Sequence, residues 1–196
     1  MIRSYFNGKA TTWDEIVAEK DESKLRHMAA RLDIGSGAVI LDVGTGTGVF
    51  IPFLLQKIGV DGKILALDIA GEMLRRARAK NFDGVVAYLN ADVAHIPLAD
   101  SSVGSVVCYS SFPHFQDRPG AFAEIYRVIK NGGHLFICHT SGREAVNGLH
   151  NGIPEVANDV IPGERAMRLT LSEAGFVDIE IEDNSENYLC QALKKS

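Results

Sequence analysis

Long apolar runs, paired cysteines and an excess of positive charge are all missing from this sequence of 196 residues. No run approaches the about 20 apolar residues of a membrane-spanning helix, and the residues from Met1 to Tyr5 lack the apolar core of a signal peptide. The formal net charge is -5, so nothing favours nucleic acid as a partner. We therefore expect a cytoplasmic protein that neither inserts into a membrane nor binds nucleic acid.

Cysteine is scarce, and each of the three residues, Cys108, Cys138 and Cys190, stands inside an apolar run typical of a strand. In such surroundings cysteine behaves as a small core residue of a reducing compartment. A chain of this length buries enough surface to fold without a disulfide or a structural metal. We expect neither.

Apolar runs typical of strands alternate with amphipathic segments typical of helices, which predicts an α/β protein with helices on both faces of a mostly parallel sheet. Residues 122–129 are expected to form one of these helices, because their apolar side chains recur at helical spacing until Gly132 and Gly133 end the helix. The predicted strands of this part of the chain span residues 38–43, 63–68, 85–90, 103–109 and 133–139.

The last third of the sequence predicts that the sheet ends in an antiparallel hairpin and not in a further parallel strand. A helix that ends at Gly175 precedes residues 177–182, in which apolar and acidic residues alternate as in an edge strand with one solvated face. A more apolar strand over 188–193 returns after turn residues. Residues 164–196 are therefore expected to form a last helix and a β-hairpin.

A short motif of alternating glycines follows the first predicted strand. It runs from Asp42 to Gly48 and has glycine at 44, 46 and 48. Glycine is used where a Cβ would block a close approach or where φ is positive, so the motif predicts a ligand lying against the backbone at the start of a helix. The dinucleotide fingerprint G-x-G-x-x-G needs a glycine where Val49 stands. Alone, the motif also fits a sharp turn in any nucleotide-binding fold.

Three motifs, each after a predicted strand, span Asp42–Gly48, Leu67–Leu74 and Asn90–Ser102. Together they resemble the motifs of class I S-adenosylmethionine-dependent methyltransferases of the small-molecule type, which include the type 11 and quinone methyltransferases, and the resemblance covers residues 38–193. It implies a Rossmann-like fold whose seven-stranded, mostly parallel sheet has the order 3-2-1-4-5-7-6 with strand 7 antiparallel. One departure is Val103-Gly104, where the family often has Phe-Asp.

The resemblance implies an enzyme that transfers a methyl group from S-adenosylmethionine to a small-molecule acceptor and releases S-adenosylhomocysteine. Two alternatives stay open: an NAD(P)-binding oxidoreductase, which Val49 and the terminal hairpin disfavour, and a protein that binds S-adenosylmethionine without catalysis. The acidic balance and the absence of an Asn/Asp-Pro-Pro-aromatic pattern disfavour methylation of nucleic acids or proteins. A homodimer is one assembly that the sequence leaves open.

We expect residues 1–196 to form one methyltransferase domain, since no repeat or linker divides the chain. Residues 1–37 would form a helical lid and residues 38–139 the cofactor-binding core. Residues 140–163, rich in glycine and asparagine and with little periodicity, are expected to form an irregular insert near the acceptor site.

The resemblance also assigns roles to cofactor-binding residues. The glycine turn would contact the methionine portion, Asp42 would hold the turn or neutralise the ammonium group, and Asp68 would accept both ribose hydroxyls. Asp92 would accept from the adenine amino group. The predicted cofactor set is Asp42, Gly44, Thr45, Gly46, Gly48, Asp68, Ile69, Met73, Ala91, Asp92, Val93 and Ser110.

The acceptor side is predicted from residues after the fourth and fifth strands and from the first segment. His114 either takes the acceptor's proton as a catalytic base or only shapes the pocket. A metal site made by two histidines with Asp159 is disfavoured because His139 and His150 lack a close helical spacing, and no metal is predicted. The predicted substrate-binding residues are Tyr5, Phe6 and Trp13, which would form an aromatic lid, and His139, Arg143 and His150.

Overall fold

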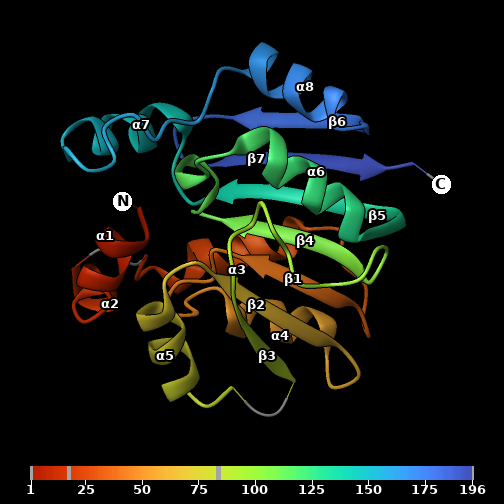
Figure 1. Ribbon diagram of the computed structural model, residues 1–196, viewed down its shortest axis with the longest axis horizontal. Helices are drawn as coiled ribbons and strands as arrows, with labels where there is room; N and C mark the ends of the chain where they lie inside the picture. Colours follow the sequence, from red (N-terminus) through yellow and green to blue (C-terminus); the bar gives the residue numbers. More distant parts are fainter. Residues whose placement is uncertain (1, 17–18, 83–84, 196) are drawn as a thin grey trace.

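The computed structural model describes residues 2–16, 19–82 and 85–195. Its strands span Val39–Val43 (β1), Lys63–Asp68 (β2), Val86–Asn90 (β3), Val103–Tyr109 (β4), Ile129–His139 (β5), Phe176–Asp183 (β6) and Tyr188–Lys194 (β7). They form a seven-stranded sheet in the order β3-β2-β1-β4-β5-β7-β6 (Figure 1). Neighbours from β3 to β5 are parallel, whereas β7 is antiparallel to both β5 and β6. The predicted fold is therefore confirmed.

Helices cover both faces of this sheet. In Figure 1, α6 lies in front of the sheet, α8 lies above β6 at its upper edge, and α3 and α4 lie behind the sheet. The buried side chains of α6 and α8 share one core cluster and those of α3 and α4 another. Among the described helices, none is both long and apolar enough to cross a membrane. The helices are α1 (Ile2–Lys9), α2 (Trp13–Ile16), α3 (Glu22–Arg31), α4 (Ile51–Ile58), α5 (Gly71–Ala79), α6 (Arg118–Val128), α7 (Arg143–Asn151) and α8 (Glu164–Glu173), with a 3-10 turn, η1, at Phe112–His114.

The central strands are apolar on both sides because each face of the sheet carries its own core. In β1, Leu41 packs with the α6 and α8 side, whereas Ile40 packs with the α3 and α4 side. Parallel strands covered on both faces read as continuous apolar runs, which is why their positions were predictable. The three cysteines are buried and free, as expected.

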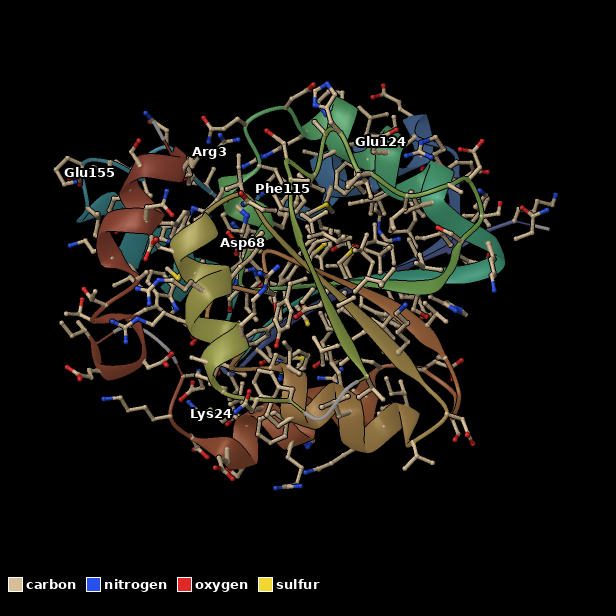
Figure 2. The ribbon with its side chains drawn as sticks, turned by 60° about the horizontal axis from the view of Figure 1, so that its bottom comes forward. Arg3, Lys24, Asp68, Phe115, Glu124 and Glu155 are labelled. Atoms are coloured by element: carbon tan, nitrogen blue, oxygen red, sulfur yellow. The ribbon has the colours of Figure 1, made fainter. Side chains whose placement is uncertain are left out.

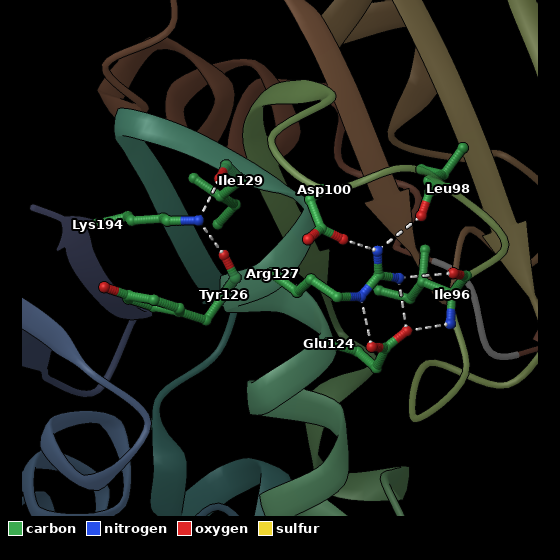
Figure 3. A network of polar contacts seen from close by, with 8 residues as sticks. All are labelled: Ile96, Leu98, Asp100, Glu124, Tyr126, Arg127, Ile129 and Lys194. Carbon is green, nitrogen blue, oxygen red and sulfur yellow. Dashed lines mark hydrogen bonds and ion pairs between the residues drawn. The ribbon is translucent and has the colours of Figure 1, made fainter. Parts of the chain in front are cut away.

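The junction between α6 and β5 differs from the prediction. β5 begins at Ile129, directly after α6, and not after the Gly132-Gly133 pair. The ammonium group of Lys194 donates to the carbonyls of Tyr126 and Ile129, each over 2.8 Å (Figure 3). Ile129 also pairs with Val103 of β4. Contacts with β4 and β7, which are distant in sequence, thus place Ile129 in the sheet although its spacing continues the helical pattern of α6.

The segment over 140–163 is more regular than predicted, because it contains α7. Weak helix formers, Asn147 and Gly148, obscure the pattern within it. The side chains of α7 that line the cavity described below nevertheless recur at helical spacing, and they are Ala145, Val146, Leu149 and His150.

Candidate active site

A cavity of about 320 Å³ lies at the carboxyl end of the parallel strands. It is lined by the glycine turn after β1, by the ends of β2, β4 and β5, and by side chains of α1, α2 and α7. Asp68 and Phe115, both labelled in Figure 2, lie at this end of the sheet. Open α/β sheets bind their ligands in this position, so the cavity is the candidate site.

The glycine turn needs residues without a Cβ. Gly44, Gly46 and Gly48 have φ values of +68°, +57° and +79°. A Cβ on Gly44 would lie 2.3 Å from the Cβ of Ser111, so only glycine fits there. Gly44 and Gly46 line the cavity, but Gly48 packs against Phe82 and does not. The structure therefore does not bring Gly48 to the predicted cofactor.

Asp42 lies beneath the turn and does not line the cavity. Its carboxylate accepts a hydrogen bond from the Thr45 hydroxyl over 2.5 Å. Burial raises the pKa of Asp42 to about 7, the Thr45 bond opposes this shift, and the charge of Asp68 adds to it. Of the two roles left open, this position supports holding the turn.

Asp68 stands at the end of β2 with its carboxylate in the cavity wall. One oxygen accepts from the N–H of Gly46 over 2.8 Å and the other from the N–H of Ala70 over 2.7 Å. Burial raises the pKa of Asp68. A carboxylate has about four acceptor sites, so each oxygen can still accept from a ligand hydroxyl.

Next to Asp68 the cavity wall is formed mostly by apolar residues, and the acidic residue Asp92 lies at its far end. Asp92 accepts from the N–H of Ala94 over 3.0 Å, which leaves its second oxygen available. The loop that follows is anchored to α6, where Glu124 accepts from the N–H of Ile96 and also binds Arg127 (Figure 3). The predicted cofactor residues that complete this wall and the strand ends are Ile69, Met73, Ala91, Val93, Thr45 and Ser110.

Three histidines meet at the opposite end of the cavity. Nδ1 of His114 lies 2.8 Å from a carboxylate oxygen of Asp159, and the ring of His150 lies beside that of His114, tilted by 46° with 4.9 Å between ring centroids. His139, at the end of β5, is 3% exposed, and its Nε2 has no hydrogen-bond partner within the described residues. Burial lowers the pKa of His139 to about 3, so this ring is neutral. A buried nitrogen of this kind is a site for a ligand hydrogen bond.

The first segment covers this end of the cavity. Phe6 packs edge-on against both Trp13 and His114, with centroid distances of 5.5 and 4.9 Å. Asp14 anchors the segment, since it accepts from the Thr47 hydroxyl and forms an ion pair with Lys80 over 2.9 Å. Two of the three predicted lid aromatics therefore reach the cavity.

Two predicted substrate-binding residues lie outside the cavity. Tyr5 packs edge-on against the outer side of Phe6, and the guanidinium group of Arg143 forms an ion pair with Asp183 over 2.8 Å. The surface position of Arg143 follows from α7, which directs Leu149 and His150 inward instead.

Sequence reasoning missed a polar group on the cavity wall. Thr140 donates to Glu19 over 3.2 Å and accepts from Tyr109 over 3.1 Å. Burial raises the pKa of Tyr109 to about 12, so its hydroxyl keeps its proton. Tyr109 and Thr140 follow the rule that strand ends face the ligand and were within reach of the sequence, whereas nothing in the pattern pointed to Glu19.

These residues fit a ligand with a diol and a flat apolar ring. The turn at Gly44 admits a close approach, Asp68 has free acceptor sites for hydroxyls, and an apolar wall runs to Asp92. These features belong to the part of the predicted S-adenosylmethionine set that lines the cavity, which leaves out Asp42 and Gly48.

Comparison with known proteins agrees with this geometry. The family model described as a methyltransferase domain matches residues 41–137. An O-methyltransferase, resE, of Aspergillus sclerotiorum is 29% identical over 93% of this chain and 72% of its own length. The malonyl-[acyl-carrier protein] O-methyltransferase of Hamiltonella defensa is 32% identical over 67% of this chain and 49% of its own.

The fold has solved counterparts as well. The SAM-dependent methyltransferase from Aquifex aeolicus superposes with a TM-score of 0.77 at 22% identity, covering 96% of this chain and 98% of that one. The chain spans about half the length of several curated relatives that it matches. The chain belongs to the class I S-adenosylmethionine-dependent methyltransferases, and S-adenosylmethionine is its cofactor.

Proposed function

We propose that this protein transfers the methyl group of S-adenosylmethionine to a small, uncharged acceptor that binds between α1, α2 and α7. The observation that carries the proposal is that one cavity is lined at one end by the glycine turn with Asp68 and at the other by His114 and the aromatics Phe6 and Trp13. Donor and acceptor would share one space from which the aromatics exclude water.

The chain's own residues would bind and orient the two reactants. Gly44 and Gly46 would contact the methionine portion of the cofactor, Asp68 its ribose, and Asp92 with Val93 its adenine. The bound cofactor supplies an activated methyl group. Holding an acceptor in line with that group supplies on the order of 7 kcal/mol or more in well-oriented model systems.

The acceptor end favours a neutral, partly apolar molecule. Phe6, Trp13 and Leu149 supply apolar surface there. Among the described residues that line the cavity, none is lysine or arginine, so a phosphate or carboxylate would find no countercharge. The O-methyltransferase name of one relative supports an oxygen acceptor. We also propose a cytoplasmic location, because the three thiols are buried and free. A homodimer stays a prediction that sedimentation can test.

Calorimetry with S-adenosylhomocysteine and with NAD tests the cofactor. We expect S-adenosylhomocysteine to bind and NAD not to bind, and Asp68→Asn to weaken binding about tenfold or more, about 1.4 kcal/mol. Asp61→Asn, an exposed acid on the opposite end of the sheet, is the matched control. Binding of NAD alone would favour the oxidoreductase. Binding of S-adenosylhomocysteine without methyl transfer to any acceptor would favour the non-catalytic alternative.

A further inference from the structure

We propose that Asp159 is a positioning residue that holds His114 as the general base of this site, and that the acceptor carries a weakly acidic hydroxyl group on an aromatic or enolic carbon. The inference rests on the proposed function and adds the class of acceptor and the group that takes its proton.

The contact between Asp159 and His114 fixes where the ring carries its proton. Oδ2 of Asp159 lies 2.8 Å from Nδ1 of His114, and each side chain is only 14% exposed. A carboxylate only accepts hydrogen bonds, so Nδ1 carries the hydrogen and the ring's lone pair stands on Nε2. Nε2 has no hydrogen-bond partner in the described part of the chain, and His114 lines the cavity. The basic nitrogen is therefore the one that is free.

The ring of His114 is also held from its sides. Phe6 of α1 packs edge-on against it, and the ring of His150 of α7 packs beside it at a tilt of 46°, each with 4.9 Å between centroids. With Asp159 on Nδ1, contacts from three segments define one orientation. A base held this way needs little reorganisation when it accepts a proton.

The loop that carries Asp159 is pinned on both sides of the site. The guanidinium group of Arg118 in α6 donates to the carbonyl of Val160 over 2.7 Å and to that of Pro113, next to His114, over 3.3 Å. Asn147 of α7 exchanges two hydrogen bonds with the backbone of Ile161, at 2.8 and 3.0 Å. The neighbours of Asp159 and of His114 in the chain are thus tied to the same guanidinium group.

The charged and titratable groups around His114 single it out among the three histidines. His150 donates from Nδ1 to the carbonyl of Asp159 over 2.5 Å, and burial lowers the pKa of His150. His139, on β5, is neutral because burial lowers its pKa to about 3. Asp68 on β2 and Arg118 on α6 are the other charges that act on this pair. Among these three histidines, and within the residues that the structure describes, only His114 pairs with a carboxylate side chain that would balance the charge of an imidazolium.

The proposed step is balanced in atoms and charge. As the acceptor oxygen uses a lone pair to bond to the transferred methyl carbon, the bonding pair of the methyl–sulfur bond stays with sulfur. The hydroxyl proton passes to Nε2 of His114. The imidazolium is paired with Asp159 and releases its proton to water after the products leave. A hydroxyl needs this base because the methylated oxygen would otherwise keep a proton and a positive charge.

The acceptor class follows from the same surroundings. Phe6 packs against His114 and Trp13 packs against Phe6, so aromatic surface lines this end of the cavity. No lysine or arginine among the described lining residues would bind an anionic group. A phenol or enol combines a flat apolar body with a proton that a neutral imidazole can take.

A series of substituted phenols of decreasing pKa, with S-adenosylmethionine and the full chain, tests the proposal. For weakly acidic phenols we expect kcat to fall roughly 100-fold or more in His114→Gln and roughly 10- to 100-fold in Asp159→Asn. For phenols already ionised at the assay pH, both variants should approach the wild type. Asp61→Asn is the matched control, and Asp159→Glu should recover part of the activity. Binding of S-adenosylhomocysteine should stay within about twofold in all variants.

Nitrogen NMR of His114 in the complex with S-adenosylhomocysteine gives a readout independent of turnover. The wild type should show the neutral form protonated at Nδ1, and Asp159→Asn should change the tautomer populations. Equal losses across the phenol series, an unchanged tautomer in Asp159→Asn, or methylation restricted to amines or carbon acids would each overturn the inference while S-adenosylhomocysteine binding and methyl transfer keep the proposed function. Absence of methyl transfer to every acceptor, with S-adenosylhomocysteine bound, would overturn both the acceptor class and the proposed enzyme activity.

Discussion

Two buried carboxylates, those of Asp42 and Asp68, accept hydrogen bonds from residues of the glycine turn and so hold its conformation. Asp42 binds the Thr45 hydroxyl, and Asp68 binds the N–H of Gly46. Each acid is surrounded by strands, so its ionised form has lost solvation that these bonds replace only in part. The shape of the turn is thereby coupled to pH.

The buried acid at position 42 should make stability depend on pH in an unusual direction. Its folded pKa, about 7, lies above the ordinary value, so between these values the folded state holds a proton that the unfolded chain has lost. Its contribution is present at low pH, declines as pH rises toward 7 and is constant above. Asp42→Asn removes it and keeps an acceptor for Thr45. From pH 5 to pH 8 the wild type should lose roughly 3 kcal/mol relative to the variant in urea unfolding. Parallel pH curves would contradict this.

The absence of a side chain at Gly44 should matter for stability, because both the space and the backbone conformation there exclude a Cβ. In Gly44→Ala the new Cβ meets Ser111 at 2.3 Å in a backbone conformation with a φ of +68°. We expect a loss of about 2 kcal/mol or more in the free energy of unfolding and weaker binding of S-adenosylhomocysteine. Gly35→Ala, where nothing lies within 4 Å of the new Cβ and φ is not in the left-handed region, should change stability by about 0.5 kcal/mol or less. Equal losses in both variants would show that Ser111 moves aside.

Cavity residues could be predicted from the sequence where they directly follow a parallel strand, because the direction of the strand determines which end of the sheet they reach. Gly44, Asp68 and Asp92 follow parallel strands, and the carboxyl ends of these strands share one edge of the sheet. Gly48 follows the same motif, yet its contact with Phe82 depends on a segment that sequence spacing does not place. Glu19 reaches the wall from outside the sheet, where no periodicity fixes direction.

At the scale of elements, the α6 and β5 junction is held by charged groups that satisfy backbone carbonyls. Arg127 donates to the carbonyls of Ile96 and Leu98 and pairs with Asp100 and Glu124 (Figure 3). These contacts tie the loop that follows Asp92 to the last turn of α6. The cofactor wall therefore depends on a helix terminus that does not itself touch the cavity.

The ammonium group of Lys194 should contribute measurably to stability at this junction. It is 8% exposed and bonds the carbonyls of Tyr126 and Ile129. Lys194→Met keeps the apolar stem but leaves both carbonyls without this donor, so we expect a loss of about 2 to 4 kcal/mol in urea unfolding. Lys195→Met, at an exposed neighbouring position, should change stability by less than about 0.5 kcal/mol. A loss below about 1 kcal/mol in Lys194→Met would mean that water replaces the ammonium group.

Element types were predicted better than element boundaries, and the junction shows why. The helical spacing of residues 122–129 is present, but Ile129 pairs with Val103 of β4, a partner that local spacing cannot reveal. In α7 a helix formed that the sequence did not predict. One side of this helix, which includes Leu149 and His150, lines the cavity, but Asn147 and Gly148 are weak helix formers and obscure the helical pattern.

For the molecule as a whole, the cavity joins the sheet to the first segment of the chain. Phe6 and Trp13 pack with Met73 and Ala70 at the start of α5, and Asp14 binds Thr47 beside the glycine turn. A ligand that fills the cavity therefore touches both the sheet and the first segment of the chain. Its binding energy should stabilise both as one unit.

Thermal unfolding observed at two places can test this coupling. Trp13 is the single tryptophan and lines the cavity, so its fluorescence reports the first segment, whereas far-UV circular dichroism reports the sheet and helices. The two transitions should coincide. S-adenosylhomocysteine at about 100 times its Kd adds about 2.7 kcal/mol, which should raise both midpoints by roughly 5 to 11 °C. NAD at the same concentration is the control and should move neither. A fluorescence transition that precedes the dichroism transition, or that S-adenosylhomocysteine leaves in place, would show that the first segment unfolds independently of the cofactor-binding core.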